Sequence, residues 1–453
     1  MYPRRAIVWF RQDLRLHDNE ALTEALSSAD EIVPVFVFDE RIFKGKTHFF
    51  GFPKTGRFRA QFIIESIHDL REALREKGSD LLVRVGKPEE AVFALAKEVR
   101  SSWVFCNRER THEEVLAQDA LEKNLWSIGQ EMRFSRGKLL YYTADLPFPI
   151  QHTPDTFSQF RKEVERAVPV RDPLPAPEKL PPVSLRLDAG EIPSLSDFRH
   201  VDIEPDPRSS FILKGGESEA LQRLHYFVWE SGLAAQLKDE RDKVAGADYA
   251  TKLSPWLAHG CLSPKLVFHE LKRYEAETGL NDIGHWMLLS LLRRDFFRFM
   301  AKKHGNRIFQ RRGIHGDADT GGADDWELLQ SWIEGTTGLP FVDANMRELS
   351  HTGFLSNRGR LNVASYLVND LKVNWQMGAE YFESVLADYD VASNWGNWNV
   401  VAGVGSDPRE HCCLNVLAQA QRYDPHGDYV KLWLPELKGL PPDKVHQQHV
   451  SYY

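Results

Sequence analysis

The first 135 residues alternate between short apolar runs and segments with helical periodicity. The apolar runs are rich in β-branched and aromatic side chains and predict strands at Ala6–Phe10, Ile32–Phe38, Leu81–Val85 and Trp103–Cys106. Arg59–Lys77 and Glu89–Arg100 predict helices, because their apolar residues recur on one stripe. This rhythm predicts an α/β fold: a doubly wound, Rossmann-like domain with a parallel sheet over residues 1–135.

The turn after the first predicted strand carries no glycine. It reads Arg11-Gln12-Asp13-Leu14-Arg15. Both the GxGxxG fingerprint and the P-loop need glycines where the backbone approaches a phosphate. The sequence therefore disfavours an ordinary NAD or ATP site in this domain.

The pattern changes twice after residue 135. Residues 136–208 include a proline-rich stretch, with Pro169, Pro173, Pro175, Pro177, Pro181 and Pro182, and predict an extended connector. Beyond it, Glu217–Gly232, Asn281–His304 and Ala379–Leu386 are long amphipathic segments with few strand-like alternations. Residues 209–453 are therefore predicted to form a larger, all-helical domain.

The composition limits the class of protein. A chain of 453 residues with 42% hydrophobic and 27% charged side chains can bury the cores of two or three domains. No run approaches the roughly eighteen apolar residues that a membrane-spanning helix needs. The four cysteines form no CxxC pair, and His446 and His449 read as part of a solvated tail, so we expect a cytoplasmic protein without disulfides or a metal site. The net charge of -8 means that nucleic-acid binding would need a local basic patch.

The densest runs of unusual polar residues lie between residues 339 and 405. They are Asp343–Arg347, Ser356–Arg360 and Asp388–Trp398. Polar density of this kind inside helices indicates a ligand or a buried network, because unpaired buried polar groups are costly. In their order, together with Trp9–Arg15, Asp145–Phe148, Tyr423–Pro425 and Leu432–Trp433, these runs make the whole chain resemble the photolyase/cryptochrome family, specifically its DASH branch.

The resemblance implies an antenna domain at the N-terminus and a helical domain that holds FAD in a U shape. It assigns to FAD the positions Thr251, Lys252, Leu253, Ser254, Arg294, Arg360, Asp388, Asp390 and Asn394. The first four match the segment around the diphosphate, and Arg360 and Asp388 match an ion pair beside the isoalloxazine. Asp390 matches a partner at the flavin edge, and Asn394 matches the amide that faces flavin N5 and can accept or donate there. Taken singly, each residue also fits a helix cap or a surface ion pair.

The resemblance also implies an antenna and an electron chain. Glu109 is similar to the glutamate that holds the pterin 5,10-methenyltetrahydrofolate, with a charge on a surface helix as the alternative. Trp398 and Trp375 match the first two members of the tryptophan chain that reduces photoexcited FAD. The third position is Gly322, and Trp326 is the nearby substitute.

Several positions depart from the family pattern around the expected substrate cavity. Ser290 stands where photolyases have a glutamate that binds the cyclobutane dimer, and Arg293 stands where they have a stacking tryptophan. Leu361 replaces a glutamine, Val400 replaces an aromatic residue, and Leu237 replaces a tyrosine at the FAD phosphate. These changes indicate that the chain retains the flavin pocket of the family, whereas the residues that recognise the pyrimidine dimer at the entrance of the pocket differ.

Other positions still match nucleic-acid contacts of the family. Asn357, Arg358 and Gln419 match residues that touch the flipped dimer or the DNA backbone. Arg241, Arg312 and Arg409 extend this set to a basic rim, and Arg293 can still contact a nucleic acid by stacking its guanidinium on a base. The alternative is that these arginines are scattered over a solvated surface.

These observations leave three hypotheses. The first is a DASH-type, blue-light FAD flavoprotein that binds single-stranded or locally opened DNA, or RNA, and repairs pyrimidine dimers weakly or in an altered way. The second is a monomeric blue-light photoreceptor that signals to a protein partner through flavin photoreduction. The third is a flavoprotein with a thermal redox task. We favour the first, and no hypothesis involves a membrane.

Overall fold

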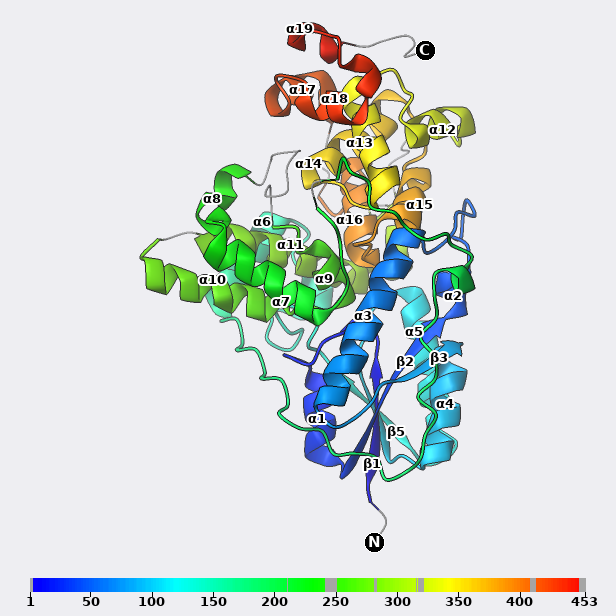
Figure 1. The fold of residues 1–453 in the computed structure, drawn as a ribbon. Coiled ribbons are helices and arrows are strands. Elements are labelled where there is room, and N and C mark those ends of the chain that lie inside the picture. Colours follow the sequence, from blue (N-terminus) through cyan, green and yellow to red (C-terminus); the bar gives the residue numbers. More distant parts are fainter. Residues whose placement is uncertain are drawn as a thin grey trace.

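The computed structural model describes residues 3–209, 211–240, 251–280, 283–314, 316, 322–407 and 413–447. Arg241, Arg409, His449 and the side chain of Leu237 lie outside the described part. In Figure 1 a sheet flanked by helices occupies the N-terminal end of the molecule, and a helical region occupies the C-terminal end. The predicted fold class, an α/β domain plus a larger helical domain, is confirmed.

A parallel sheet forms the centre of the N-terminal domain. Its strands are β1 (Arg5–Phe10), β2 (Glu31–Asp39), β3 (Leu82–Gly86), β4 (Trp103–Asn107) and β5 (Glu131–Ser135). In the described part of the chain the order is β3-β2-β1-β4-β5, with Ala6 opposite both Ile32 and Trp103. The four predicted strands are confirmed within one residue at each end. The edge strand β5 was missed, because exposed polar residues interrupt its apolar ones.

Helices cover both faces of this sheet. They are α1 (Glu20–Ser28), α2 (Glu40–Phe43), α3 (Arg57–Glu76), α4 (Pro88–Val99) and α5 (His112–Trp126). The apolar side chains of α1 and α3 join one core cluster, whereas those of α4 and α5 join another on the opposite face. Asn19 caps α1 by accepting from the Leu22 amide, and Pro88 occupies the first turn of α4, where its missing N–H has no helical partner to lose.

The connector is extended over most of its length and crosses the α/β domain. The Val83 amide donates to the Ala189 carbonyl over 2.7 Å, which ties the connector to β3. The connector also contains α6 (Phe157–Ala167) and two short 3-10 helices, Ile150–His152 and Ser196–Phe198. The sequence did not predict α6, whose buried Phe160 and Val164 pack into the core.

The rest of the described chain is helical, as predicted. Its α-helices are α7 (Glu217–His225), α8 (Leu233–Glu240), α9 (Ser254–His259), α10 (Pro264–Thr278), α11 (Ile283–His304), α12 (Trp326–Glu334), α13 (Pro340–Thr352), α14 (Asn357–Ser365), α15 (Trp375–Val385), α16 (Val391–Val401), α17 (Val416–Tyr423), α18 (Asp428–Trp433) and α19 (Pro442–Val445). The other helical segments are the π-helices Tyr226–Glu230 and Tyr366–Asp370 and the 3-10 helices Gly305–Phe309 and Pro435–Leu437.

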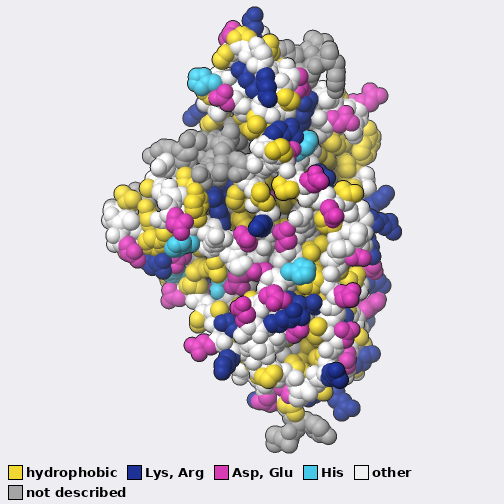
Figure 2. Space-filling model, in the orientation of Figure 1, with side chains coloured by type: hydrophobic (Ala, Val, Ile, Leu, Met, Phe, Trp, Pro, Cys, Tyr) yellow, Lys and Arg dark blue, Asp and Glu magenta, His cyan; other side chains and the backbone are white. Residues whose placement is uncertain are grey.

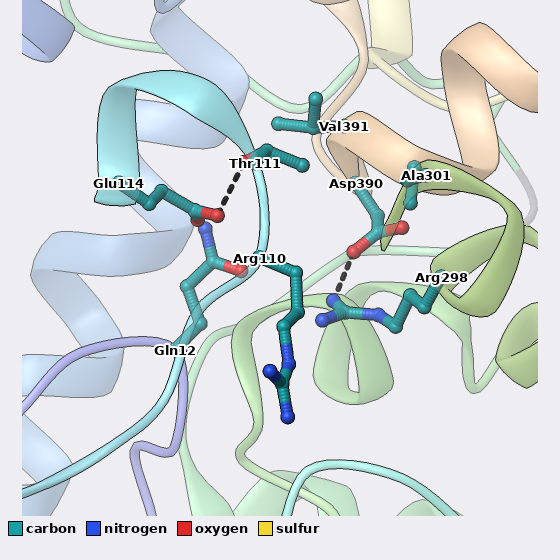
Figure 3. A pocket seen from close by; sticks show the side chains of 9 residues that line it. Gln12, Arg110, Thr111, Glu114, Arg298, Ala301, Asp390 and Val391 are labelled. Carbon is teal, nitrogen blue, oxygen red and sulfur yellow. Dashed lines mark hydrogen bonds and ion pairs between the residues drawn. The ribbon is translucent and has the colours of Figure 1, made fainter. Parts of the chain in front are cut away.

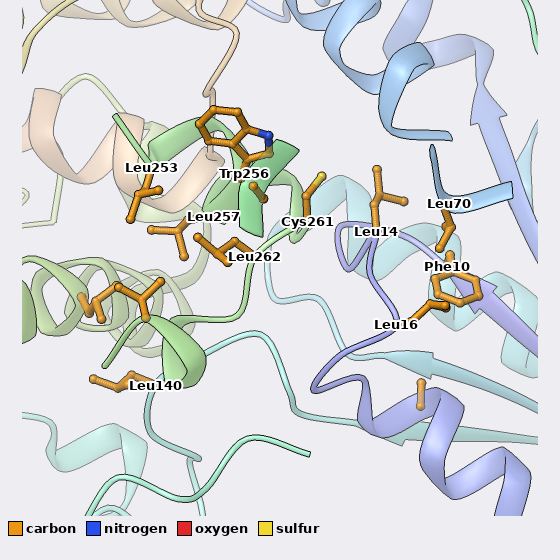
Figure 4. Close-up of a cluster of buried hydrophobic side chains, with 14 of the residues drawn as sticks. Phe10, Leu14, Leu16, Leu70, Leu140, Leu253, Trp256, Leu257, Cys261 and Leu262 are labelled. Carbon is orange, nitrogen blue, oxygen red and sulfur yellow. The ribbon is translucent and has the colours of Figure 1, made fainter. Parts of the chain in front are cut away.

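One hydrophobic core joins the two domains. Phe10, Leu14 and Leu70 of the α/β domain belong to the same cluster as Leu253 and Trp256 of the helical domain, as Figure 4 shows. This core holds α9 against the loop that follows β1. The two domains therefore form a fixed frame for residues on α9.

Gly260 closes the same junction. It ends α9 with φ of 71°, and a Cβ at this position would collide with the Gln12 carbonyl. Only glycine allows this approach. Within the described residues, no helix is long and apolar enough to span a membrane.

Candidate functional site

Three polar side chains converge between α9, α14 and α16. The Ser254 hydroxyl donates to Asp388 Oδ2 over 2.6 Å, and the Arg360 guanidinium donates to the same oxygen over 2.7 Å. The Asp388 side chain is 1% exposed. Its second oxygen, Oδ1, is buried and has no hydrogen-bond partner among the described residues. A buried carboxylate oxygen without a partner is costly, so this atom indicates a ligand that donates a hydrogen bond.

The segment before Ser254 places a cation in the same region. Lys252 is buried, takes φ of 54°, and lies with its ammonium 5.0 Å from the Phe211 ring. Leu253 is also buried, and its amide donates to the Thr251 hydroxyl over 3.4 Å. The ammonium and this turn of backbone suit an anionic group such as a phosphate.

A second buried network lies where the domains meet, on the inner side of α11. Figure 3 shows Arg298 reaching the carboxylate of Asp390, with which it forms an ion pair. Glu109, in the loop after β4, pairs with Lys138 over 2.7 Å and lies 3.8 Å from Arg298. Arg294 donates to the carbonyls of Lys138 and Leu257. The two carboxylates and the cations Arg298 and Lys138 thus pair across the junction of the domains, and Arg294 is held beside them by backbone carbonyls.

The charges of this network follow from burial and pairing. Burial favours the neutral form of Asp390, but Arg298, Arg294 and Lys138 outweigh burial and hold the pKa of Asp390 well below its usual value. Glu109 behaves in the same way, with Lys138 as its main counter-charge, so its pKa is also lowered. Burial and the neighbouring Arg298 lower the pKa of Arg294 to about 10. At neutral pH, Asp390 and Glu109 are therefore ionised inside the molecule.

A small pocket opens beside this network. Its lining includes Gln12, Arg110, Glu114, Arg298 and Asp390 (Figure 3). The interpretation of Glu109 as a surface helix charge is wrong, because this side chain is 2% exposed and precedes α5. Its role towards a pterin stays a prediction.

Asn394 and Trp398 lie one turn apart on α16 and therefore on one face. The Asn394 amide nitrogen donates to the Ala379 carbonyl of α15 over 3.0 Å. The Trp398 ring is buried and contacts Phe382 at 5.2 Å between ring centroids. Both predicted residues therefore lie on the face of α16 that packs against α15.

The remaining members of the predicted electron-transfer chain, Trp375 and Trp326, do not contact each other. Trp375 is fully buried and its nearest aromatic contact is Trp395, at 5.7 Å. Gly322 lies beside the same helix start, because a Cβ there would be 2.9 Å from the Asn374 amide nitrogen. The expected third position is therefore in place but carries no ring. Trp326 is 50% exposed at the start of α12.

The two altered substrate positions lie on α11. Ser290 is exposed, and its hydroxyl donates to the Trp286 carbonyl of the same helix over 3.3 Å. The Arg293 guanidinium lies 4.3 Å from the centre of the Phe157 ring. Neither side chain presents a carboxylate or an indole. Two further altered positions, Leu361 and Val400, are half-buried and pack against the core clusters.

Three of the predicted nucleic-acid contacts, Asn357, Arg358 and Gln419, lie together at the start of α14 and on α17, whereas Arg293 lies on α11. Arg358 donates to the Gln419 side chain over 3.3 Å and lies 4.6 Å from the Tyr423 ring. Arg422 lies 5.2 Å from the same ring, and Asn357 is exposed. On the face drawn in Figure 2, acidic and basic side chains are interspersed. Attraction of a nucleic acid would therefore depend on this local cluster and not on the overall charge of the protein.

The sequence missed three residues of this region. Arg298 and Lys138 complete the buried ionic network, and Trp332 contacts Trp398 at 6.4 Å. Arg298 follows Arg294 by four residues in one helix, which places both on one face, so this spacing was a usable signal. His446 was wrongly taken as part of a solvated tail. It is 4% exposed and its ring bonds the Asp424 carbonyl.

No group of three or more potential metal ligands gathers among the described residues. Two family models match the chain: the DNA photolyase model over residues 6–178 and the FAD binding domain of DNA photolyase over residues 286–452. A curated relative from Gloeobacter violaceus, Cryptochrome DASH, is 48% identical over 447 residues, which cover 99% of this chain and 89% of that one. Cryptochrome DASH of Xenopus laevis is also 48% identical, with coverages of 98% and 85%.

Solved structures agree with these matches. The crystal structure of a Synechocystis cryptochrome superposes with a TM-score of 0.94 at 44% identity, covering 99% of this chain and 92% of that one. A bacterial class III photolyase from Agrobacterium tumefaciens superposes with a TM-score of 0.85 at 29% identity, covering 99% and 90%.

Proposed function

Because the chain belongs to the DASH branch of the photolyase/cryptochrome family and is a blue-light-absorbing FAD flavoprotein, we propose that it binds single-stranded nucleic acid and repairs cyclobutane pyrimidine dimers only weakly. The proposal rests on a flavin site that keeps the polar groups around Asp388 and on a substrate site whose reactive groups are replaced. Each part is supported by different residues.

The residues around Asp388 fit FAD. The unpartnered Oδ1 of Asp388 suits an N–H of the isoalloxazine ring, while Ser254 and Arg360 fix the carboxylate through its other oxygen. Lys252 suits the diphosphate. When bound, FAD supplies the chromophore and the one-electron redox centre. Asn394, held by Ala379, supplies a neutral amide that tolerates a change of flavin charge.

The cluster at α14 and α17 supports binding of a single strand. Arg358 and Arg422 supply charge for phosphates, and Tyr423 supplies an aromatic surface between them. Stacking on aromatic rings and cations along a backbone are what single-stranded binding needs, without readout of sequence. Asn357 and Gln419 add amide groups at the edge of this cluster. A separate part of the proposal is that Glu109 holds a pterin antenna.

The observation that carries the proposal of weak repair is the pair of changed residues on α11. Repair needs groups that bind the reacting lesion more strongly than its product, not only affinity for DNA. A carboxyl group at position 290 could share a proton with the charged lesion, whereas the Ser290 hydroxyl is engaged with its own helix. The guanidinium of Arg293 lies over Phe157 and offers a base no indole.

A photoreceptor without repair activity is the second candidate, and the same two residues favour it. In that case, electron transfer from Trp398 would shift a conformational equilibrium instead of splitting a lesion. The two candidates differ in one measurable property, which is any light-dependent turnover of dimers.

The direct test compares the wild-type holoprotein with the double variant Ser290→Glu/Arg293→Trp. Both are reduced and illuminated with a single-stranded oligonucleotide that carries one thymine dimer, and the recovery of thymine absorbance is followed. A proton-sharing group contributes about 10²–10⁴-fold to a rate, so we expect repair by the wild type to be slower than repair by the variant by about 10²-fold or more. The control is Ser290→Ala, which should match the wild type. Equal rates for wild type and double variant would refute the proposal, and zero repair by the wild type would favour the photoreceptor.

A further inference from the structure

The usual electron route from the flavin lacks the ring of its third member in this chain, because that position is Gly322. Trp375 is buried, and the expected third position beside it is Gly322, which is also buried and carries no ring. The one ring contact recorded for Trp375 among the described residues leads to Trp395, which is 3% exposed. Beyond Trp395 the recorded ring contacts are phenylalanines, Phe309 at 5.1 Å and Phe49 at 6.4 Å, and Phe49 reaches Trp326 only through a second phenylalanine, Phe50. A phenylalanine is much harder to oxidise than a tryptophan or a tyrosine, so this side offers a hole at Trp375 a poorer way to the surface.

A different series of rings leaves the other side of Trp398. Trp332 lies 6.4 Å from Trp398 between ring centroids, with the planes at 73°. Trp332 in turn lies 5.6 Å from Tyr381. Trp332 is fully buried and its indole N–H donates to the Val363 carbonyl over 3.0 Å, so the ring is held in one orientation.

The series continues to the surface through the N-terminal domain. Phe52 lies 6.0 Å from Tyr381 and 6.0 Å from Trp326, which is 50% exposed. Figure 1 shows the loop after α2 reaching the helical domain near α15. The amides of Phe49 and Phe50 hold that loop there by donating to the Glu380 carboxylate over 2.7 and 2.8 Å.

We propose that Trp332 and Trp326 form the electron-donating branch in this chain, with Tyr381 and Phe52 as the packed medium between them. The inference rests on the proposed light chemistry of FAD. Trp398 gives one electron to photoexcited FAD and takes one from Trp332, which takes one from Trp326. Trp326 then loses its indole proton to water and remains as a neutral radical, until an added thiol returns one electron and one proton.

The end points of this branch follow from solvent access. A tryptophan that has lost an electron is acidic at nitrogen, so an exposed indole is trapped by proton loss to water. The buried Trp332 instead keeps the proton on its own nitrogen, which donates a hydrogen bond to the Val363 carbonyl. Burial raises the pKa of Tyr381 to about 12, and no acceptor for its hydroxyl proton is recorded among the described residues. Tyr381 is therefore a poor place for the charge to stop. The two tryptophans are six residues apart on α12, a rise of about 9 Å along the helix, which the two packed rings span.

The test uses flash photolysis of the oxidised holoprotein and follows the absorption of the neutral tryptophan radical. We expect a long-lived radical in the wild type, its loss in Trp326→Phe, and its retention in Trp375→Phe. Trp326→Tyr should restore part of the signal, because an exposed tyrosine can also give up an electron and a proton. The FAD content and the initial quenching of flavin fluorescence should be unchanged in Trp326→Phe, since Trp398 is intact.

One further outcome would refute only the proposed branch, and another would refute the light chemistry on which the branch rests. A radical that survives in Trp326→Phe but disappears in Trp375→Phe would overturn the branch and leave the proposed function standing. No flavin photoreduction in the wild-type holoprotein, with or without thiol, would overturn the light chemistry itself and the branch with it.

Discussion

A buried ion pair between the domains gives the sharpest prediction about how the site is positioned. Lys265, in the first turn of α10, lies 2.8 Å from Asp18 in the loop after β1, and the two side chains are 1% and 0% exposed. The ammonium also donates to the Tyr142 hydroxyl over 3.0 Å, and Asp18 accepts from the Leu174 amide over 3.0 Å. The pair thus ties together the α/β domain, the connector and the helical domain.

The substitution Lys265→Met removes the counter-charge and leaves the Asp18 carboxylate buried. Breaking a buried pair in this way costs about 3–5 kcal/mol, whereas replacing both partners by uncharged groups is often close to neutral. We therefore expect Lys265→Met to lower the free energy of unfolding by about 3–5 kcal/mol. The double variant Asp18→Asn/Lys265→Met should recover most of this loss, because the side-chain oxygen of the substituted amide can still accept from the Leu174 amide.

The assay is urea unfolding of the four proteins of this cycle at saturating FAD, followed by flavin release and far-ultraviolet circular dichroism. Flavin release should shift to lower urea together with unfolding, since α9 and α10 are held at the same junction. A loss under about 1 kcal/mol for Lys265→Met, or a double variant whose loss equals the sum of the single ones, would refute the reasoning.

Three further predictions concern pH, binding and packing. Burial lowers the pKa of His259 to about 4 from 6.5, so the folded state binds fewer protons than the unfolded state between these values, and the stability that His259 contributes falls by about 3 kcal/mol as pH drops from 6.5 to 4. Unfolding titrations should show this slope in the difference between wild type and His259→Gln, and a constant difference would contradict it. Arg358→Ala should weaken binding of a single-stranded oligonucleotide and reduce the slope of log affinity against log salt by about 0.7, whereas Lys123→Ala on α5 should change neither. Gly378→Ala should cost about 1–3 kcal/mol and lower the yield of flavin photoreduction, because its methyl group would collide with the Trp398 ring. An unchanged yield with unchanged stability would contradict that packing.

The sequence predicted those parts of the fold in which each element is determined locally. The strands β1 to β4 are continuous apolar runs, because a parallel sheet covered by helices is buried on both faces. The edge strand β5 has only one covered side and carries Glu131 and Arg133 among its apolar residues, so its pattern did not stand out. The helix α6 was missed because its buried apolar face is only three side chains and the proline-rich stretch begins directly after it.

For the candidate site, the sequence supplied residue identities but not their partners. The ion pair of Arg360 with Asp388 was implied by family resemblance, and the structure places these side chains 2.7 Å apart. The link from Asp390 to Arg298, and from there to Glu109, joins three elements that are distant in sequence. Pairing of this kind depends on how the domains dock, and no local pattern encodes it.

The aromatic series beyond Trp398 shows the same limit. Trp326 was noticed only because it lies near Gly322 in sequence, whereas its connection to Trp332 passes through Phe52 of the other domain. A ring from the N-terminal domain therefore completes a path that the helical domain lacks.

The central claim is that this chain keeps the light chemistry of its family while its repair is weak. The most direct measurement is a single illumination experiment on the wild-type holoprotein that records both flavin photoreduction and repair of a thymine dimer in single-stranded DNA. We predict efficient photoreduction with dimer repair that is slow and is accelerated by Ser290→Glu/Arg293→Trp. Rapid repair by the wild type, at a rate that the double variant does not exceed, would contradict the account.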